Sequence, residues 1–333
     1  MDSQSTNSAT AFNRVPLHIP SGSSVQWWMG LLLMFLMGLA LGGCDSAGPP
    51  DEQGNTPGLP EPPVQSFPRW SPDGDRVLYY DHGLVRYDPE TNRSEHDQGQ
   101  KGLWTMRPDG TDRRQVLSGA SLYGDWSPSG DSLVFERGGQ IYKAAFEGGV
   151  VDTASTVRLT PSGRYFDPDW SPSGKQIAYR NSIGDTTGVW LSPTDGSQSR
   201  EHFTKGGRPQ WFPSSQRLLY TCNGSLFVEA LDHSTRIQIY SLPDSDDLHR
   251  IHGSSISPNG DRIAAGLPFQ VWTMDADGSD KDQLTGRTGQ EPDWSPDGER
   301  IVYIGPEHTI WVMDADGTDK EQVTTRPEGP VGR

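Results

Sequence analysis

The chain has 333 residues and a formal net charge of −16, from 28 Lys and Arg against 44 Asp and Glu. Only 32% of its residues are hydrophobic, while 39 Gly and 27 Pro make up about a fifth of it, a composition that excludes a helical bundle or a coiled coil. The acidic balance also disfavours nucleic acid as a partner, because phosphate binding needs a basic surface. Recurring Trp and Tyr favour many short strands joined by tight turns.

The N-terminal region has the pattern of an export and anchoring signal. Residues 25–41 form an uncharged apolar run of 17 residues, which suits a signal-peptide core better than a membrane-spanning helix. The run leads into Leu41-Gly42-Gly43-Cys44, which resembles the lipobox of bacterial lipoproteins. This resemblance implies that residues 1–43 are a signal peptide with a long leader and that Cys44 is lipidated. An uncleaved signal anchor is the alternative.

Residues 44–63 are predicted to be a tether between the lipidated Cys44 and a folded domain. The stretch from Asp45 to Val64 holds six Pro and three Gly, a composition typical of flexible linkers. Once residues 1–43 are removed and Cys44 is modified, Cys222 is the only remaining thiol, so we expect no intramolecular disulfide. Its apolar neighbours indicate a small core residue.

From residue 64 onward the chain is built on a repeat. The string WSPDG begins at Trp70 and again at Trp294, and variants of it begin at Trp126, Trp170, Trp211 and Ile256. These six anchors are separated by 56, 44, 41, 45 and 38 residues. A period near 40 residues in an all-β chain is typical of propeller blades.

Every repeat has the same internal order. The anchor ends a first strand, and Ser-Pro-Asp-Gly then forms a turn, because Pro presets φ and Gly tolerates a left-handed conformation. A second strand, a third strand with an aromatic residue, a hairpin turn and a fourth strand follow. Six such units predict a six-bladed all-β propeller with four antiparallel strands per blade over residues 64–326, followed by a C-terminal tail over 327–333. The predicted third-strand aromatics are Trp104, Tyr142, Trp190, Phe227, Trp272 and Trp311.

The last repeat shows the pattern most fully, as PDWSPDGERIVY followed by IWVMDADGTDKEQVT over Pro292–Thr324. This pattern resembles the WD40-like repeats of the TolB family, over about residues 64–326. The resemblance implies a propeller that serves as an interaction scaffold of the bacterial envelope, without a cofactor. TolB itself carries an additional α/β domain before its propeller and works with the lipoprotein Pal. Here the tether leads straight to Trp70, so we expect that domain to be absent.

Three repeats depart from the pattern. In the first, either Leu84–Tyr87 or Gly102–Asp109 is the third strand, and the other is an insertion. Val64–Trp70 either begins the first blade or completes the last one. The fourth repeat has Ser215 in place of the turn Gly, and the fifth has Ile256 in place of the anchor Trp.

The sequence lacks recognisable catalytic motifs, which predicts a non-enzymatic protein. No G-x-S-x-G elbow of an α/β-hydrolase occurs. His249 and His252 form an isolated HxxH without the Glu of a metalloprotease. In the DADG segments Gly comes fourth rather than sixth, so these segments are predicted to be hairpin turns and not EF-hand calcium loops.

One set of polar residues is predicted to face the axial channel, because the first strand of each blade lines it. These residues stand one position and three positions before each anchor. Five of them are acidic, and Arg69 and Arg208 are partial counter-charges. Such a carboxylate ring is suited to a hard cation or a basic peptide, and the alternative is local hydrogen bonding at strand ends and turns. The five candidates are Asp125, Asp167, Asp169, Glu291 and Asp293.

The sequence therefore favours a membrane-anchored envelope lipoprotein whose propeller binds a protein or peptide. Its expected location is the periplasmic face of the inner or outer membrane, or the cell surface, with the lipid on Cys44 as the anchor. The alternative is binding of a small ligand, a cation or a carbohydrate, in the acidic channel. A propeller hydrolase or lyase is the third hypothesis.

Overall fold

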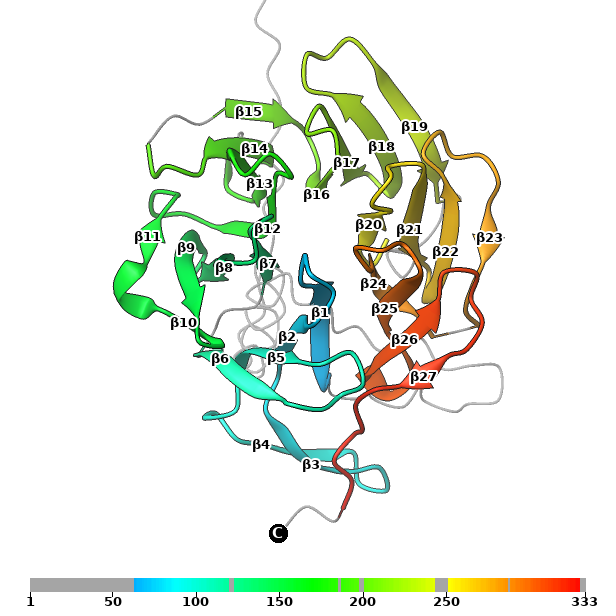
Figure 1. The fold of residues 1–333 in the computed structure, drawn as a ribbon. Helices are drawn as coiled ribbons and strands as arrows, with labels where there is room; N and C mark the ends of the chain where they lie inside the picture. The colour runs from blue at the N-terminus through cyan, green and yellow to red at the C-terminus, as the bar shows by residue number, and fades with distance from the viewer. Residues whose placement is uncertain are drawn as a thin grey trace, which may run out of the picture. The chain divides into compact units, whose positions relative to one another are not determined.

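A computed structural model of the chain describes residues 63–119, 123–184, 187–197, 201–242, 251–286 and 288–329. These residues form six antiparallel sheets around a central axis (Figure 1). The predicted six-bladed propeller with four antiparallel strands per blade is therefore confirmed. The signal peptide over 1–43, Cys44, the tether except Pro63, and the end of the tail lie outside the described residues. No helix of the described segments is long and apolar enough to cross a membrane.

The strands have the same order in every blade, from an inner strand at the axis to an outer strand. The inner strands are β1 (Gln65–Trp70), β7 (Gly124–Trp126), β12 (Tyr165–Trp170), β16 (Gly207–Trp211), β20 (Ser254–Ile256) and β24 (Gln290–Trp294). The second strands are β2 (Val77–Asp81), β8 (Ser132–Arg137), β13 (Gln176–Asn181), β17 (Arg217–Cys222), β21 (Arg262–Leu267) and β25 (Arg300–Ile304). Every predicted anchor thus ends an inner strand.

The third strands are β5 (Gly102–Met106), β9 (Gln140–Glu147), β14 (Gly188–Pro193), β18 (Ser225–Ala230), β22 (Gln270–Asp275) and β26 (Ile310–Asp314). The outer strands are β6 (Arg114–Ser118), β15 (Glu201–Thr204), β19 (Arg236–Ser241), β23 (Asp282–Gln283) and β27 (Glu321–Gln322). In blade 2 the outer position is divided between β10 (Val150–Val151) and β11 (Val157–Arg158), which both pair with β9 on either side of the short 3₁₀ helix Thr153–Ser155. A second 3₁₀ helix, Pro306–His308, lies between β25 and β26.

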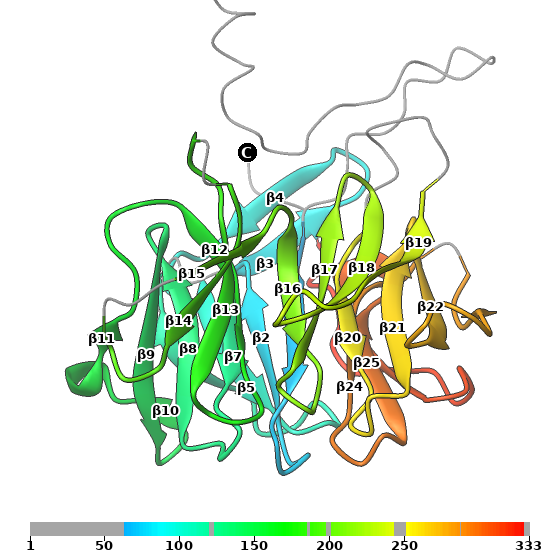
Figure 2. The ribbon, with the colours of Figure 1, turned by 90° about the horizontal axis from the view of Figure 1, so that it is seen from above.

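The connections between strands lie alternately on two faces, because neighbouring strands are antiparallel. We call the face that carries the turns from inner to second strands the turn face. The opposite face carries the turns from second to third strands and the segments that lead into each inner strand, and we call it the mouth face. In Figure 2 the β17–β18 turn lies at the upper end of the propeller and the β1–β2 turn at the lower end.

The WSPDG segments form the β-turns that the sequence predicts. In the first repeat the backbone N–H of Gly74 donates to the carbonyl oxygen of Ser71 at 2.9 Å, and the other five repeats have the same bond at 2.8 to 2.9 Å. Ser215, which replaces the turn Gly in blade 4, adopts the same left-handed conformation, with φ at 55°. Its Oγ accepts the backbone N–H of Ser173 in blade 3 at 3.0 Å.

A cross-strand pair of aromatic residues forms the centre of five blades. The second strand contributes a fully buried ring at the same position of each repeat, and the third strand places its predicted aromatic directly opposite. In blade 5 the second-strand residue is Ala265 instead. The five pairs are Tyr79–Trp104, Phe135–Tyr142, Tyr179–Trp190, Tyr220–Phe227 and Tyr303–Trp311.

Blade 1 departs from the repeat by an inserted hairpin. β5 pairs with β2 and carries Trp104, so Gly102–Met106 is the third strand. β3 (Leu84–Asp88) and β4 (Arg93–His96) form a separate two-stranded sheet, and Figure 1 shows them outside the ring. The hairpin holds the end of the described chain, because Tyr87 forms a parallel bridge with Glu328.

The ring closes by side-chain packing and hydrogen bonds between blades 1 and 6. β1 belongs to the sheet of blade 1, and β27 is the outer strand of blade 6. Trp70 and Tyr79 share a buried cluster with Val302 and Ile310 across this seam. The Oγ1 of Thr324 donates to Oε1 of Gln65 at 2.9 Å and accepts the backbone N–H of Ile310.

Candidate binding site at the channel mouth

The mouth of the channel is shaped by an irregularity in the inner strands. β1, β12, β16 and β24 each shift register three residues before the anchor. The residue at the shift has a positive φ of 51° to 56°, a conformation that costs a residue with a side chain about 1 kcal/mol or more. These residues are Phe67, Asp167, Arg208 and Glu291. The sequence predicted that they face the channel but gave no signal of this backbone conformation.

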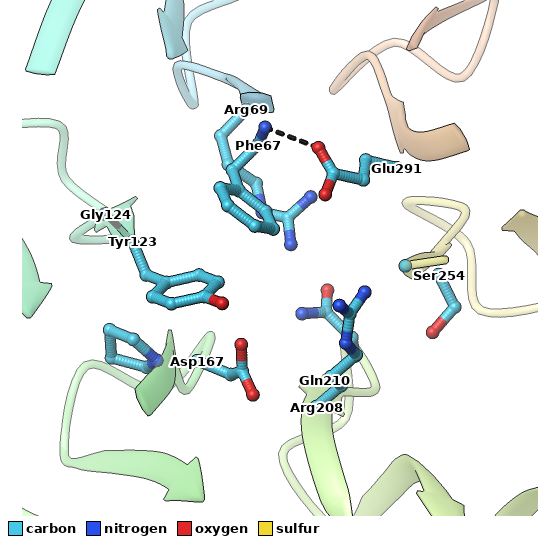
Figure 3. A pocket seen from close by; sticks show the side chains of 11 residues that line it. Phe67, Arg69, Tyr123, Gly124, Asp167, Arg208, Gln210, Ser254 and Glu291 are labelled. Carbon is cyan, nitrogen blue, oxygen red and sulfur yellow. Dashed lines mark hydrogen bonds between the residues drawn. The ribbon is translucent and has the colours of Figure 1, made fainter. Parts of the chain in front are cut away.

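The side chains at the mouth line one narrow pocket. The space between its protein atoms is about 460 Å³, and part of that space is open solvent. Only about 30 Å³ is wide enough to hold the centre of a water molecule. Figure 3 shows that Phe67, Tyr123, Asp167, Arg208 and Glu291 converge on it from five blades. The free space is therefore suited to one side chain or a similarly small group.

One wall of the pocket is aromatic. The ring centroids of Phe67 and Tyr123 are 4.3 Å apart, and Phe166 supports Tyr123 edge-on, with centroids 6.3 Å apart. Burial is the main cause that raises the pKa of Tyr123 above its usual value, so this phenol stays neutral near neutral pH. The wall offers an apolar surface to any group that enters the mouth.

The remaining wall is polar and charged. Oδ2 of Asp167 lies 2.9 Å from Nε of Arg180, and Oε2 of Glu291 accepts the backbone N–H of Phe67 at 2.7 Å. Burial raises the pKa of Glu291, although the nearby Arg208 and this hydrogen bond oppose the shift. Ser254 is 2% exposed, and its Oγ has no hydrogen-bond partner among the described residues.

Below the mouth, three of the predicted acidic residues join neighbouring blades. The Oδ2 of Asp125 accepts the backbone N–H of Trp170 at 2.7 Å, and Asp169 bonds Trp211 in the same way at 2.7 Å. Asp293 completes the set with a bond to the N–H of Trp70 at 2.8 Å. Each bond connects one blade to the anchor of the next, so these carboxylates have a structural role inside the channel. Their place in the channel follows from the repeat, whereas the bonds between blades depend on the tertiary structure.

Arg69 is the counter-charge of this inner carboxylate ring. Its Nη1 lies 3.8 Å from Oδ1 of Asp293. Burial acts to lower the pKa of Arg69, but the charges of Asp293, Asp125 and Asp169 raise it overall. Burial in turn raises the pKa of all three carboxyls, that of Asp293 to about 6 and that of Asp169 well above its usual range, the latter also because of the Asp125 charge.

The five predicted acidic residues are thus divided between two levels, with Asp167 and Glu291 at the mouth and the other three in the interior. Within the described segments, no three His, Cys, Asp or Glu side chains are arranged to hold a metal ion. His252 packs its ring against Phe269, with centroids 5.1 Å apart, whereas His249 lies outside the described residues. Cys222 ends β17 as a partly buried free thiol.

The architecture matches solved TolB structures. A protein provisionally assigned as TolB from Agrobacterium tumefaciens superimposes with a TM-score of 0.53 at 20% identity, over 64% of this chain and 84% of that one. TolB from Acinetobacter baumannii gives 0.55 at 18% identity, over 74% and 63% of the respective chains. This chain folds as a TolB-like propeller. At these identities the likeness concerns the fold alone.

Sequence relatives of this TolB-like propeller are distant. The chain is 23% identical over 288 residues to the uncharacterised protein Atu1656 of Agrobacterium fabrum, covering 73% of this chain and 85% of that protein. It is 25% identical over 169 residues to the uncharacterised peptidase YuxL of Bacillus subtilis, covering 49% of this chain and only 24% of the peptidase. A probable dipeptidyl peptidase 4 of Emericella nidulans is 27% identical over 161 residues, which are 47% of this chain and 19% of that enzyme. No family model matches the chain.

Proposed function

We propose that this TolB-like propeller is a non-enzymatic interaction scaffold of the bacterial cell envelope, which binds a protein or peptide at its mouth face. The observation that carries the proposal is the construction of the mouth. Each of four inner strands holds one non-glycine residue whose backbone is left-handed. This backbone conformation directs the four side chains into one pocket. Backbone strain that is repeated at a single site indicates a function for that site.

The size of the pocket favours a partner whose contacts extend beyond it. The free space admits about one side chain, which offers little area for the affinity of an isolated ligand. Ile183 and Phe269, which are 45% and 44% exposed, lie on turns of the same face. A protein segment that inserts one side chain at the axis can also cover these two residues, as in other interfaces with a central anchor.

The envelope location and the anchor belong to the same proposal. The TolB likeness supports the envelope, and the lipobox-like Leu41–Cys44 supports a lipid on Cys44. A tether of 20 residues, 44–63, has a root-mean-square span of about 25 Å as a flexible chain. The propeller would therefore remain close to the membrane and meet partners in the surrounding envelope space.

The peptidase relatives do not change this proposal. They align with about half of this chain and with less than a quarter of their own length, so the alignment involves only a part of each enzyme. If the purified full-length chain hydrolysed a panel of proline-containing peptides, and charge-neutral variants at Asp167 or Glu291 lost that turnover, an enzymatic role would replace the proposed one.

Crosslinking in intact cells tests the proposal directly. A photoreactive residue at Ile183, on the mouth face, is compared with one at Asp277, an exposed residue in a turn on the turn face. We expect a discrete crosslinked protein from position 183 and none from position 277. Specific adducts from position 277 alone would contradict the assignment of the binding face.

The anchor has its own test. Cells that express the full chain are labelled with palmitate, and the Cys44→Ser variant serves as the control. We expect label in the parent chain and none in the variant. Label that persists in Cys44→Ser would show that Cys44 is not the lipidated residue.

A further inference from the structure

The mouth face carries a group of positive charges although the whole chain has a net charge of −16. They lie over blades 2 to 4, at the ends of second strands and in the segments that lead into inner strands. We call this group the basic rim. It consists of Arg137, Arg164, Arg180, Lys205 and Arg208.

The basic rim is continuous from blade 2 to blade 4. The carbonyl oxygen of Gly139, two residues after Arg137, accepts the N–H of Tyr165, which follows Arg164. The carbonyl oxygen of Arg164 accepts the N–H of Ser182 in the next turn. The side chain of Arg180 packs against Gly207, which lies between Lys205 and Arg208.

Most of these cations have no ion-pair partner among the described residues, although the charge of Arg208 acts on the nearby Glu291 carboxylate. Within the described part of the chain only Arg180 has a carboxylate within ion-pair distance, that of Asp167. Glu136 is nearby in sequence, but the residue is 3% exposed and its carboxylate accepts the N–H of Gly139. On the turn face, in contrast, Arg262 pairs with three carboxylates of its own blade, those of Asp275, Asp280 and Asp282.

Phe269 is an exposed aromatic residue with a left-handed backbone in the second-to-third turn of blade 5, the blade next to the end of the rim. Its φ is 58° and the residue is 44% exposed. The corresponding turns of blades 2 and 4 use Gly138-Gly139 and Asn223-Gly224 at left-handed positions, as expected for residues that tolerate this conformation. The ring of Phe269 contacts His252, with centroids 5.1 Å apart, but leaves nearly half of the residue exposed on the mouth face.

We propose that the basic rim and Phe269 form one docking surface for an acidic segment of a partner protein. The carboxylates of the segment would lie against blades 2 to 4, and an apolar side chain of the same segment would cover Phe269 in the adjacent blade 5. Charge complementarity selects this occupant, since three rim cations, Arg137, Arg164 and Lys205, have no carboxylate within ion-pair distance among the described residues. The inference rests on the proposed function and adds the chemistry of the partner.

Peptide binding to the purified full-length chain tests this surface. The probes are three peptides of equal length with one central Phe, in which the other residues are rich in Glu, in Gln or in Lys. We expect the Glu-rich peptide to bind most tightly and to weaken as salt is added. Lys205→Glu should weaken it about tenfold, whereas Lys175→Glu, the same charge change at an exposed lysine of the turn face, should leave it unchanged.

Phe269→Gly separates a binding role from a structural one. Gly removes the ring and its contact with His252 but relieves the left-handed strain, so we expect a melting temperature that is not lowered together with weaker binding of the Glu-rich peptide. A lower melting temperature with unchanged binding would show that Phe269 serves the fold and would overturn its role as an anchor.

Two results would overturn the inference and leave the proposed function intact. The first is a crosslinked protein from position 183 that is recovered equally with Lys205→Glu and with Lys175→Glu. The second is binding of the chain to phosphatidylglycerol vesicles through the rim, with no competition from the Glu-rich peptide. If position 183 gives no crosslink but the Glu-rich peptide still binds at the rim, the proposed cellular function fails and the docking chemistry stands.

Discussion

The carboxylate of Asp293, in the last blade, accepts the backbone N–H of Trp70, in the first blade, at 2.8 Å. These residues are separated by 223 positions in the sequence, and their bond crosses the seam at which the ring closes. Asp125 and Asp169 make the same bond to Trp170 and Trp211. At three of the six contacts between neighbouring blades a carboxylate therefore makes this bond, and the charges of all three carboxylates act on Arg69.

Replacing Arg69 by Met should destabilise the propeller by about 3 kcal/mol or more, because three buried carboxylates lose their counter-charge. Asp293→Asn in the same chain should recover part of this loss, since one of the three charges is then removed. Urea unfolding of the two single variants and the double variant measures the coupling. Arg300→Met, which removes an arginine that stacks on Trp70 at 4.9 Å, is the control and should cost about 1 kcal/mol. A loss at Arg69 no larger than that of the control would contradict the role of Arg69.

Among the groups that make the stability of the propeller depend on pH between 4 and 6, Asp293 and His82 act in opposite directions. Burial raises the pKa of Asp293 to about 6, so its contribution to stability is present at low pH and is lost as the pH rises through this range. Burial, together with the charge of Lys101, lowers the pKa of His82 to about 4, so its contribution increases as the pH rises. We compare the free energy of unfolding at pH 6 with that at pH 4. Relative to the parent chain, Asp293→Asn should make this difference more positive, and His82→Gln should make it more negative.

Urea midpoints at several pH values for the parent and both variants measure these slopes. The Nε2 of His82 lies 2.9 Å from Oγ of Ser66, and Gln retains a side-chain nitrogen that can bond this hydroxyl. Parallel curves for all three chains would show that neither group has a shifted pKa.

Variants of Ser215 test whether a hydrogen bond offsets the strain of a non-glycine residue in the turn of blade 4. Ser215→Gly removes a strained φ of 55° but also the hydroxyl that accepts the N–H of Ser173. These effects are each about 1 kcal/mol and opposite in sign, so the free energy of unfolding should change by less than about 0.5 kcal/mol. Ser215→Ala loses the bond and keeps the strain, and it should be less stable than Ser215→Gly by about 1 kcal/mol. Equal stability of the two variants would show that the strain has no cost.

Thr324 tests the closure between the first and last blades. Its hydroxyl accepts the N–H of Ile310 within blade 6 and donates to Gln65 in blade 1. Thr285, at the same position of blade 5, accepts the N–H of Val271. In thermal or urea unfolding, Thr324→Val should cost about 1 kcal/mol more than Thr285→Val, because it also breaks the bond across the seam. The same loss at both positions would contradict a role for Thr324 in closure.

The repeat made most of the fold predictable, because each blade is encoded by contacts within about 40 residues. Pro and Gly in WSPDG specify a turn on their own, and the anchor must end the strand that precedes it. In the first repeat this local information was insufficient, since Leu84–Tyr87 and Gly102–Asp109 both have strand-like patterns. Pairing of β5 with β2 decided between them, and this pairing places Trp104 opposite Tyr79.

The candidate site was predictable in its location but not in its chemistry. Sequence periodicity placed Asp125, Asp167, Asp169, Glu291 and Asp293 at the axis, because they occupy fixed positions before the anchors. The pattern gave no indication that Asp125, Asp169 and Asp293 bond the anchor of the next blade or that Arg69 lies among them. The positive φ values at the mouth could not be predicted from the sequence either, since Phe and Glu rarely adopt them, as Phe67 and Glu291 do here.

The net charge of −16 was determined by composition, and so was the expectation of an acidic protein that avoids nucleic acid. Only the tertiary structure decided where the opposite charges lie. The cations of blades 2 to 4 are scattered along the sequence from Arg137 to Arg208, and they meet because strand topology brings second-to-third turns and inner-strand entrances to one face. Local sequence specifies strands and turns through short-range contacts, whereas a surface is defined by residues that only folding makes neighbours.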